Sequence, residues 1–194
     1  EKKQIAVDIG FIVFNEKTYP NLIEFFKENK IQVEKSNMSF SVTLKDTNIE
    51  YCGQGISGVF SNRKNILNPK FIKMFFEIIN FYKKCANINI VKLNKETLGD
   101  FLEKENLSDY FINYHIIPMV AAIWSMHPYE AKQMPLNFFI NFFKNHGLFK
   151  LKNRPQWFTV SNRSKTYVDK IISQISGEHY KNYPINKITR NKDN

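Results

Sequence analysis

The glycines at positions 53, 55 and 58 lie in the stretch GQGISG, which fits the GxGxxG spacing of a dinucleotide-binding loop. Such a loop holds a pyrophosphate on its backbone N–H groups, follows the first strand of a βαβ unit and opens a helix. GQGISG instead follows a predicted antiparallel hairpin, which makes phosphate binding the weaker interpretation. A flexible turn is favoured, and a close approach of the backbone to a large flat group stays open as the alternative.

The histidines are scattered along the chain, at His115, His127, His146 and His179. None forms the i, i+4 pair that places two metal ligands on one helix face, so no metal site is predicted. His115 has apolar and aromatic neighbours, which favours a core histidine, although work as a catalytic base stays open. His127 is expected at a helix start. His146 is expected at a helix C-terminus, where its imidazole interacts favourably with the helix dipole. No serine or cysteine lies in a recognisable nucleophile turn.

The two cysteines, Cys52 and Cys85, lie far apart and outside any CxxC motif. Neither a zinc site nor a disulfide framework is indicated, which favours a reducing compartment, the cytoplasm. No signal peptide and no membrane span is predicted.

An almost wholly apolar stretch, VDIGFIVFN, carries an aspartate and a glycine in its first half. We expect a buried strand over residues 5–14. An unpaired carboxylate in such a strand is costly, and glycine weakens a strand. The presence of Gly10 in a buried strand therefore needs a separate explanation. Asp8, if buried, needs a backbone N–H pair or a cation such as Lys2 or Lys3 to compensate its charge.

The chain has 194 residues, of which 43% are hydrophobic, including 18 Phe and 9 Tyr. This aromatic load predicts a core of large side chains and a pocket walled by aromatic rings. The formal net charge of +10 comes from dispersed lysines. A dispersed charge indicates a solvated surface and argues against a nucleic-acid partner, which a basic stripe would favour.

The order of the predicted elements is β, then α, then β. Residues 1–60 are β-rich, residues 61–150 are helical, and residues 151–194 return to strands with one helix. This order predicts an α+β fold in which a helical insertion separates strands of one mixed or antiparallel sheet, with 1–194 as a single domain. Alternation predicts a hairpin over 38–53, a strand over 155–161 and a final strand over 183–189. Helical periodicity predicts helices over 18–30, 70–84, 97–105, 108–124, 135–147 and 165–176.

Helix boundaries are marked by capping residues. Thr97 and Asp100 have the spacing of a capping box, and Ser108 is placed to cap the next helix. Pro118 is expected to kink or restart that helix, and Gly147 to end the one that follows.

Four ordered segments resemble a known family: VDIGFIVFNEKTYPNL, AAIWSMHP, FFKNHGL, and RPQWFTV followed by SKTYVDKI. They are similar to the flavin-dependent amine oxidase superfamily, especially its bacterial branch of FAD-binding oxidoreductases, over essentially the whole chain. The resemblance implies a substrate-binding domain. It also implies that the chain is the middle of a longer protein, with a Rossmann-type unit and its GxGxxG loop before Glu1.

The resemblance also implies flavin contacts near the first strand. Residues 8–13 match the family's turn in which the backbone passes close to the isoalloxazine ring, and Gly10 matches the glycine that leaves room for that ring. Phe11 stands where a second glycine is common. The implied FAD-binding residues here are Gly10, Phe11, Ile12 and Val13.

Further flavin contacts are implied towards the C-terminus. In YPINKIT, Ile185 takes the position whose main chain pairs with the adenine. Asn162 and Arg163 replace the Gly-Gly that usually follows the QWFTV strand.

The chemistry that the resemblance implies is oxidation of an amine or a hydrophobic small molecule by hydride transfer to FAD in a dry pocket. The protein binds and orients the substrate and the cofactor, and the cofactor performs the redox step. No catalytic residue is assigned, and this chain alone is expected to be inactive because it lacks the main phosphate cradle. The alternative is a non-catalytic module that binds a hydrophobic ligand or a partner on the same scaffold, which Phe11 and Asn162-Arg163 would favour.

Overall fold

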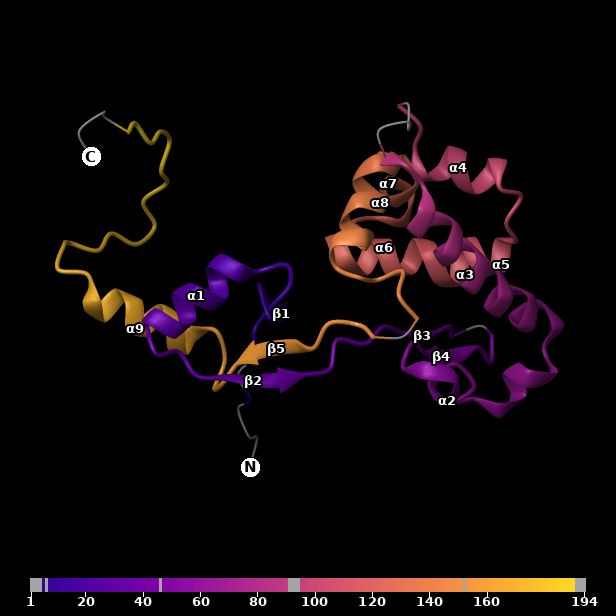
Figure 1. Cartoon of the computed structure of the whole chain (residues 1–194), viewed down its shortest axis with the longest axis horizontal. Helices are drawn as coiled ribbons and strands as arrows, with labels where there is room; N and C mark the ends of the chain where they lie inside the picture. The colour runs from indigo at the N-terminus through magenta and orange to yellow at the C-terminus, as the bar shows by residue number, and fades with distance from the viewer. Residues whose placement is uncertain (1–4, 6, 46, 91–94, 152, 191–194) are drawn as a thin grey trace.

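The computed structural model describes residues 5, 7–45, 47–90, 95–151 and 153–190. These residues form a smaller lobe built on a sheet and a larger lobe built mainly from helices (Figure 1). Each lobe has its own hydrophobic cluster of buried side chains. The fold is therefore α+β, as predicted, with antiparallel sheets.

The sheet of the smaller lobe has the order β1-β5-β2. Its strands are β1 (Phe14–Asn15), β2 (Val33–Ser36) and β5 (Trp157–Val160). β5 runs antiparallel to both neighbours, so a strand that follows the helical region returns to the first strand, as the β, α, β order predicted. The second neighbour, β2, and the central place of β5 were not predicted. Helices α1 (Pro20–Glu28) and α9 (Lys165–Gln174) belong to the same lobe. Its core is small: Phe14, Phe26, Ile31 and Val160.

The predicted buried strand over residues 5–14 is wrong except at its last residue. Residue 5 and residues 7–13 have no regular secondary structure, and Ile5, Val7 and Ile9 are largely exposed. The reason lies in the partner strand, because β5 pairs with β1 only opposite Phe14 and Asn15. An apolar run can form a strand only where a partner offers its backbone groups.

The helical lobe contains the predicted hairpin, formed by β3 (Ser41–Thr43) and β4 (Glu50–Cys52). The prediction of one sheet is wrong, because the hairpin pairs only with itself and forms a second sheet. A 3₁₀ helix spans Arg63–Leu67, and a π-helix spans Ile112–Ile116. The α-helices of this lobe are α2 (Gly55–Val59), α3 (Pro69–Asn87), α4 (Leu98–Lys104), α5 (Asp109–Phe111), α6 (Ile117–Trp124), α7 (Pro128–Gln133) and α8 (Leu136–Asn145).

The GQGISG segment forms a short helix, α2, where a flexible turn was predicted. Gly55 begins it with a φ of +70°, a left-handed conformation that glycine adopts without strain. A Cβ at Gly58 would lie 2.8 Å from the carbonyl oxygen of Cys52. At Gly58 the backbone therefore approaches a peptide group of the chain itself.

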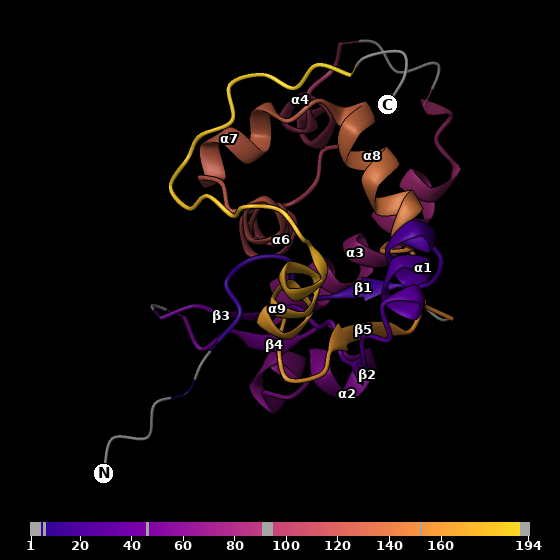
Figure 2. The same ribbon diagram turned by 90° about the vertical axis from the view of Figure 1, so that its left-hand side faces the viewer.

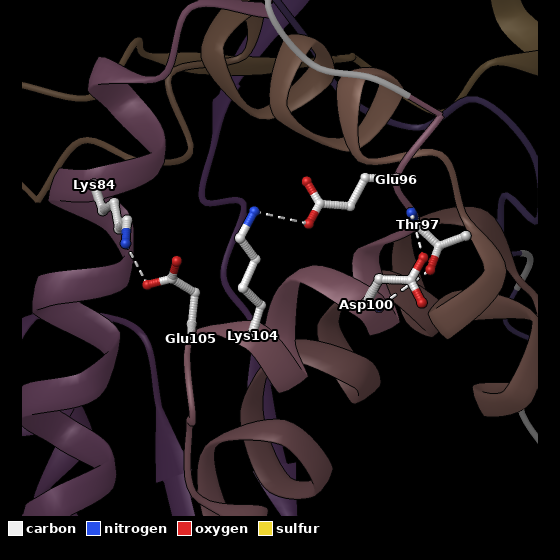
Figure 3. Close-up of polar contacts among 6 residues, drawn as sticks. All are labelled: Lys84, Glu96, Thr97, Asp100, Lys104 and Glu105. Carbon is white, nitrogen blue, oxygen red and sulfur yellow. Dashed lines mark hydrogen bonds and ion pairs between the residues drawn. The ribbon is translucent and has the colours of Figure 1, made fainter.

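Local capping predictions are confirmed. In the capping box of α4, Thr97 Oγ1 accepts from Asp100 N at 3.1 Å, and Asp100 Oδ2 accepts from Thr97 N at 3.0 Å (Figure 3). Ser108 caps α5, and Gly147, with a φ of +66°, follows the last turn of α8. The hydrogen bond from Leu148 N to the Phe143 carbonyl closes that helix end.

Two ion pairs are found around α4. Lys84 on α3 pairs with Glu105 at the end of α4, and Lys104 Nζ lies 3.5 Å from Glu96 Oε1 (Figure 3). Both lysines are largely exposed, so water screens these pairs and each contributes little to stability.

Substituting Thr97→Ala is expected to lower the free energy of unfolding by about 1 kcal/mol, because the N-cap acceptor is lost. Urea unfolding followed by circular dichroism measures the change. Thr97→Ser keeps the hydroxyl and is the matched control; an equal loss in both variants would show that the hydroxyl does not stabilise α4.

Candidate functional site

The segments that carry the resemblance meet where the two lobes touch. His146, just after α8, has its ring 4.0 Å from the Phe142 ring and 6.2 Å from the Trp157 ring, stacked with both. The Tyr19 hydroxyl lies 3.3 Å from His146 Nε2. We call Tyr19, Phe142, His146 and Trp157 the junction cluster. Trp124 extends it through Phe142, at 4.7 Å between ring centroids.

The hydrogen bonds of His146 define its tautomer. Nδ1 lies 2.9 Å from the Phe142 carbonyl oxygen, which can only accept, so Nδ1 carries the proton. Nε2 is then the acceptor and the Tyr19 hydroxyl donates to it. Burial raises the pKa of Tyr19, which keeps this donor protonated. His146 therefore satisfies the C-terminus of α8, as predicted, and links it to the residue that precedes α1.

The predicted flavin-binding residues of the first segment lie at the surface. Phe11 is 45% exposed and Ile12 is 48% exposed, while Val13 is half-buried. A Cβ built on Gly10 meets no protein atom within 4 Å. A flat ring could therefore approach the backbone of Gly10 without meeting a protein atom at that position.

Residues 8–12 are held against the turn between β5 and α9 by side-chain hydrogen bonds. Ser164 N donates to Asp8 Oδ2 at 3.0 Å, and Ser164 Oγ donates to the Phe11 carbonyl at 3.1 Å. Thr159 Oγ1 donates to the Ile12 carbonyl at 2.8 Å. These bonds fix the segment beside the sheet although it is not itself a strand.

The half-buried Asp8 is thus compensated by a backbone N–H, one of the partners expected for it. The alternative partners, Lys2 and Lys3, lie outside the described residues.

The turn that holds this segment contains Asn162 and Arg163, with φ of 61° and 76°. Both values lie in the left-handed region, which glycine adopts most readily. The backbone here therefore has the conformation that a Gly-Gly pair would favour, although neither residue is glycine.

Ile185 does not join this site. It is 76% exposed, and the strand predicted over 183–189 is wrong, because these residues have no regular secondary structure. The segment that follows α9 runs away from β1 in both views (Figures 1 and 2). Among the residues described, no strand lies there to pair with it.

Phe11 connects the surface segment to the junction cluster. Its ring packs edge-to-face on Tyr19 at 5.6 Å and stacks on Phe14 at 6.4 Å. The open face of Gly10 therefore lies one residue from an aromatic wall that leads to the contact between the lobes. Such a wall suits a flat, apolar molecule.

A buried polar cluster in the helical lobe surrounds His115. The Tyr51 hydroxyl lies 2.7 Å from the Tyr114 carbonyl oxygen and 3.0 Å from His115 Nδ1, and the Tyr82 hydroxyl lies 2.9 Å from His115 Nε2. Tyr51 donates its single proton to the carbonyl, so Nδ1–H donates to Tyr51 and Nε2 accepts from Tyr82. His115 is neutral and fully hydrogen-bonded, as expected of a core histidine.

Pro118 explains why the Tyr114 carbonyl oxygen can accept a hydrogen bond from the Tyr51 hydroxyl. Proline has no N–H, so it cannot donate to the residue four positions earlier, which is Tyr114. The helix passes through the π-helix Ile112–Ile116 just before Pro118, and the Tyr51 hydroxyl takes the vacated acceptor. Pro118 was a sequence signal for this partner, whereas the spacing of Tyr51, Tyr82 and His115 gave none.

Burial perturbs every titratable group of this cluster. It lowers the pKa of His115 from 6.5 to about 3 and raises the pKa of Tyr51 and of Tyr82 above the usual value for tyrosine. Desolvation is the largest cause in each case because it penalises the charged form. The cluster therefore stays uncharged at neutral pH, as a structural network does.

The two cysteines are the remaining candidates from the sequence. Cys52 and Cys85 are both free, and burial raises the pKa of Cys85 to about 12, which makes its thiol unreactive. Among the described residues, no group of three His, Cys, Asp or Glu side chains could hold a metal ion. No helix in the described part of the chain is long and apolar enough to span a bilayer. No family model matches this chain, and neither does any curated protein.

Proposed function

We propose that this chain is the substrate-binding portion of a flavin-dependent oxidoreductase that oxidises an amine or a hydrophobic small molecule by hydride transfer to FAD. The observation that carries most weight is the open backbone face of Gly10, beside the half-exposed Phe11 and Ile12. This is the segment in which the sequence resembles the flavin-contacting turn of the amine oxidases.

Bound FAD would supply the redox step by accepting a hydride from the substrate. The chain's own residues would bind and orient the flavin and the substrate. Gly10, Phe11, Ile12 and Val13 would hold the ring, while Ser164 and Thr159 fix the backbone carbonyls of the same segment.

The junction cluster would form the apolar wall for the substrate. Phe11 and Tyr19 lead from the Gly10 backbone to the stacked rings of Phe142, His146 and Trp157. Aromatic walls exclude water and favour a flat or apolar substrate over a highly charged one. This supports the hydrophobic molecule within the proposed substrate class.

The test of this function is the visible spectrum of the full-length protein expressed from its own gene. The two-band absorption of oxidised flavin, bleached when substrate is added without oxygen, is the expected result. A colourless, folded protein that takes up no added FAD would overturn the proposal.

Substituting Gly10→Val is expected to abolish flavin retention while leaving the thermal midpoint of the flavin-free protein unchanged. The new side chain projects into open space, so it blocks a bound ring without meeting a protein atom. Gly177→Val is the matched control, because Gly177 also has no protein atom within 4 Å of an added Cβ. Equal flavin content in both variants and the wild type would show that Gly10 is not part of the flavin site.

A second candidate function, a non-catalytic module for a hydrophobic ligand or partner, is favoured by the exposed apolar side chains of the same segment. Ile5, Val7 and Ile9 are each more than two-thirds exposed, and Phe11 replaces a glycine that is common in the enzymes. An apolar ligand bound to the full-length protein in the absence of flavin would distinguish this function from the enzyme.

A further inference from the structure

A separate pocket lies in the helical lobe, where the first turns of α3 meet α5 and the π-helix. It holds about 370 Å³, a volume typical of small-molecule sites. In Figure 1, α5 lies on the side of the helical lobe that faces away from α1 and β1. The side chains that give this pocket its chemistry are those of Lys70, Lys73, Asp109, Tyr110, Asn113 and Tyr114.

The charges around the pocket balance. Lys70 and Lys73 each bring one positive charge, and Asp109 brings one negative charge. Glu77 brings the second negative charge, because its carboxylate lies 3.8 Å from Lys73 Nζ and accepts hydrogen bonds from the N–H and the hydroxyl of Ser108. A ligand with a net charge of either sign would disturb this balance, so the pocket favours a neutral ligand.

The pocket offers both donors and acceptors of hydrogen bonds. Among the residues that the structure describes, four side chains at the pocket use their polar atoms in no hydrogen bond to another residue: Asp109, Tyr110, Asn113 and Tyr114. The hydroxyls and the amide can each donate and accept, whereas the carboxylate only accepts. A ligand that matches these groups must itself donate and accept at several positions, as a set of hydroxyl groups does.

The two tyrosines give the pocket an apolar wall. Their rings pack edge-to-face at 4.8 Å, and Lys70 Nζ lies over the Tyr110 ring, 5.7 Å from its centroid. The Lys70 ammonium group is thus held beside the wall. Tyr114 is half-buried and lines the pocket, so the C–H groups of a ligand can pack on its ring.

The π-helix positions two of these side chains. Asn113 and Tyr114 belong to it, and π-helical turns are frequent at functional sites. Here the turn places Asn113 and Tyr114 at the pocket and His115 in the core.

We propose that this pocket binds a neutral, polyhydroxylated ring, that is, a sugar. A sugar ring is uncharged, its hydroxyl groups both donate and accept, and its faces present C–H groups. The hydroxyls would bind Asp109, Tyr110 and Asn113, and a C–H face would pack on Tyr114. This site is independent of the flavin proposal, since it shares no residue with the Gly10 segment or the junction cluster.

The experiment titrates the full-length protein with the neutral methyl glycosides of glucose, galactose, mannose and N-acetylglucosamine, and follows binding by ¹H–¹⁵N NMR. We expect at least one glycoside to shift the amide signals of Asn113 and Tyr114 until the site is saturated. Because the ligand is uncharged, its affinity is expected to be the same at low and at high salt.

Asn113→Ala and Tyr114→Phe are each expected to weaken this binding about fivefold, because each removes one hydrogen-bonding group. Asn113 is exposed and Tyr114→Phe keeps the ring, so both variants are expected to keep the thermal midpoint of the wild type. Asn80→Ala is the matched control, because it removes the same amide from an exposed position of α3 outside the pocket. Its affinity is expected to be unchanged.

Several outcomes would overturn the site. They are no binding of any of the glycosides, shifts confined to residues outside the pocket, or an equal loss of affinity in Asn80→Ala. Glucuronate and glucosamine add a carboxylate and an ammonium group to the sugar ring, and either one binding more tightly than the glycosides would contradict a neutral ligand. Benzyl alcohol has a ring but a single hydroxyl, so equally tight binding of that compound would contradict a polyhydroxylated ligand.

Discussion

Acidification from pH 6.5 towards pH 3 is expected to destabilise the fold by up to about 1.4 kcal/mol per pH unit through His115 alone. Burial lowers the pKa of His115 to about 3 in the folded chain, against 6.5 when the side chain is in water. Between these values the unfolded chain binds a proton that the folded chain does not. Stability from this residue is therefore complete above pH 6.5 and falls as the pH falls.

The hydrogen bonds around His115 explain why protonation is costly. A proton on Nε2 would force the Tyr82 hydroxyl to give up that acceptor and turn its own proton to Met119 Sδ, which lies 3.5 Å away. Sulfur is a weak acceptor. The charged ring would also stand in a core position that is only 5% exposed.

Urea unfolding of the wild type and of His115→Gln, between about pH 7 and about pH 5, measures this effect. Glutamine does not titrate, but its amide can donate to Tyr51 and accept from Tyr82, so it keeps the pairing. We expect the free energy of unfolding to fall with pH in the wild type and to be nearly flat in the variant. Parallel curves for the two proteins would contradict a depressed pKa at His115.

Phe139→Ala is expected to lower the free energy of unfolding by about 3–5 kcal/mol. Phe139 is fully buried in α8, and its ring lies 4.3 Å from that of Phe143, 6.0 Å from that of Phe149 and 6.3 Å from that of Phe81. Truncation leaves a cavity among large rigid rings that cannot close around it.

Phe138→Ala is the matched control, because Phe138 is the preceding residue on the same helix but is 50% exposed. We expect a change of about 1 kcal/mol or less for that variant. Urea unfolding followed by far-ultraviolet circular dichroism, which reports on the helices, measures both. Similar losses in the two variants would show that α8 does not pack by its Phe139 face.

The sequence predicted the features that depend on neighbours along the chain. Thr97 with Asp100, Ser108 before its helix and Gly147 after its helix act within one turn, and all three are found where they were expected. The return of the strand at 157–160 to the strand that ends at Asn15 also followed from the order of elements, whereas its pairing with β2 was not predicted. Capping and helical periodicity depend on residues that are close together in the sequence, so they can be predicted from a single sequence.

Features that depend on a partner elsewhere were missed. The strand over 5–14 and the strand over 183–189 had suitable patterns, but periodicity does not say whether a strand will find a neighbour. The junction cluster joins Tyr19, His146 and Trp157 from distant segments, and only the resemblance had marked those segments together. In the candidate site, Gly10 to Val13 lie in one open segment, whereas the segment after α9, which contains Ile185, runs away from β1.

The place of β5 in the middle of its sheet has a consequence for how the chain folds as it is synthesised. β1 and β2 leave the ribosome before the helical lobe, and the strand that pairs with both is made more than one hundred residues later. The helical lobe, whose core lies within residues 42–149, can form in the meantime from its own contacts. The first strands must wait for Trp157–Val160, so the sheet closes last, and the contact between Tyr19 and His146 is completed by a late docking step.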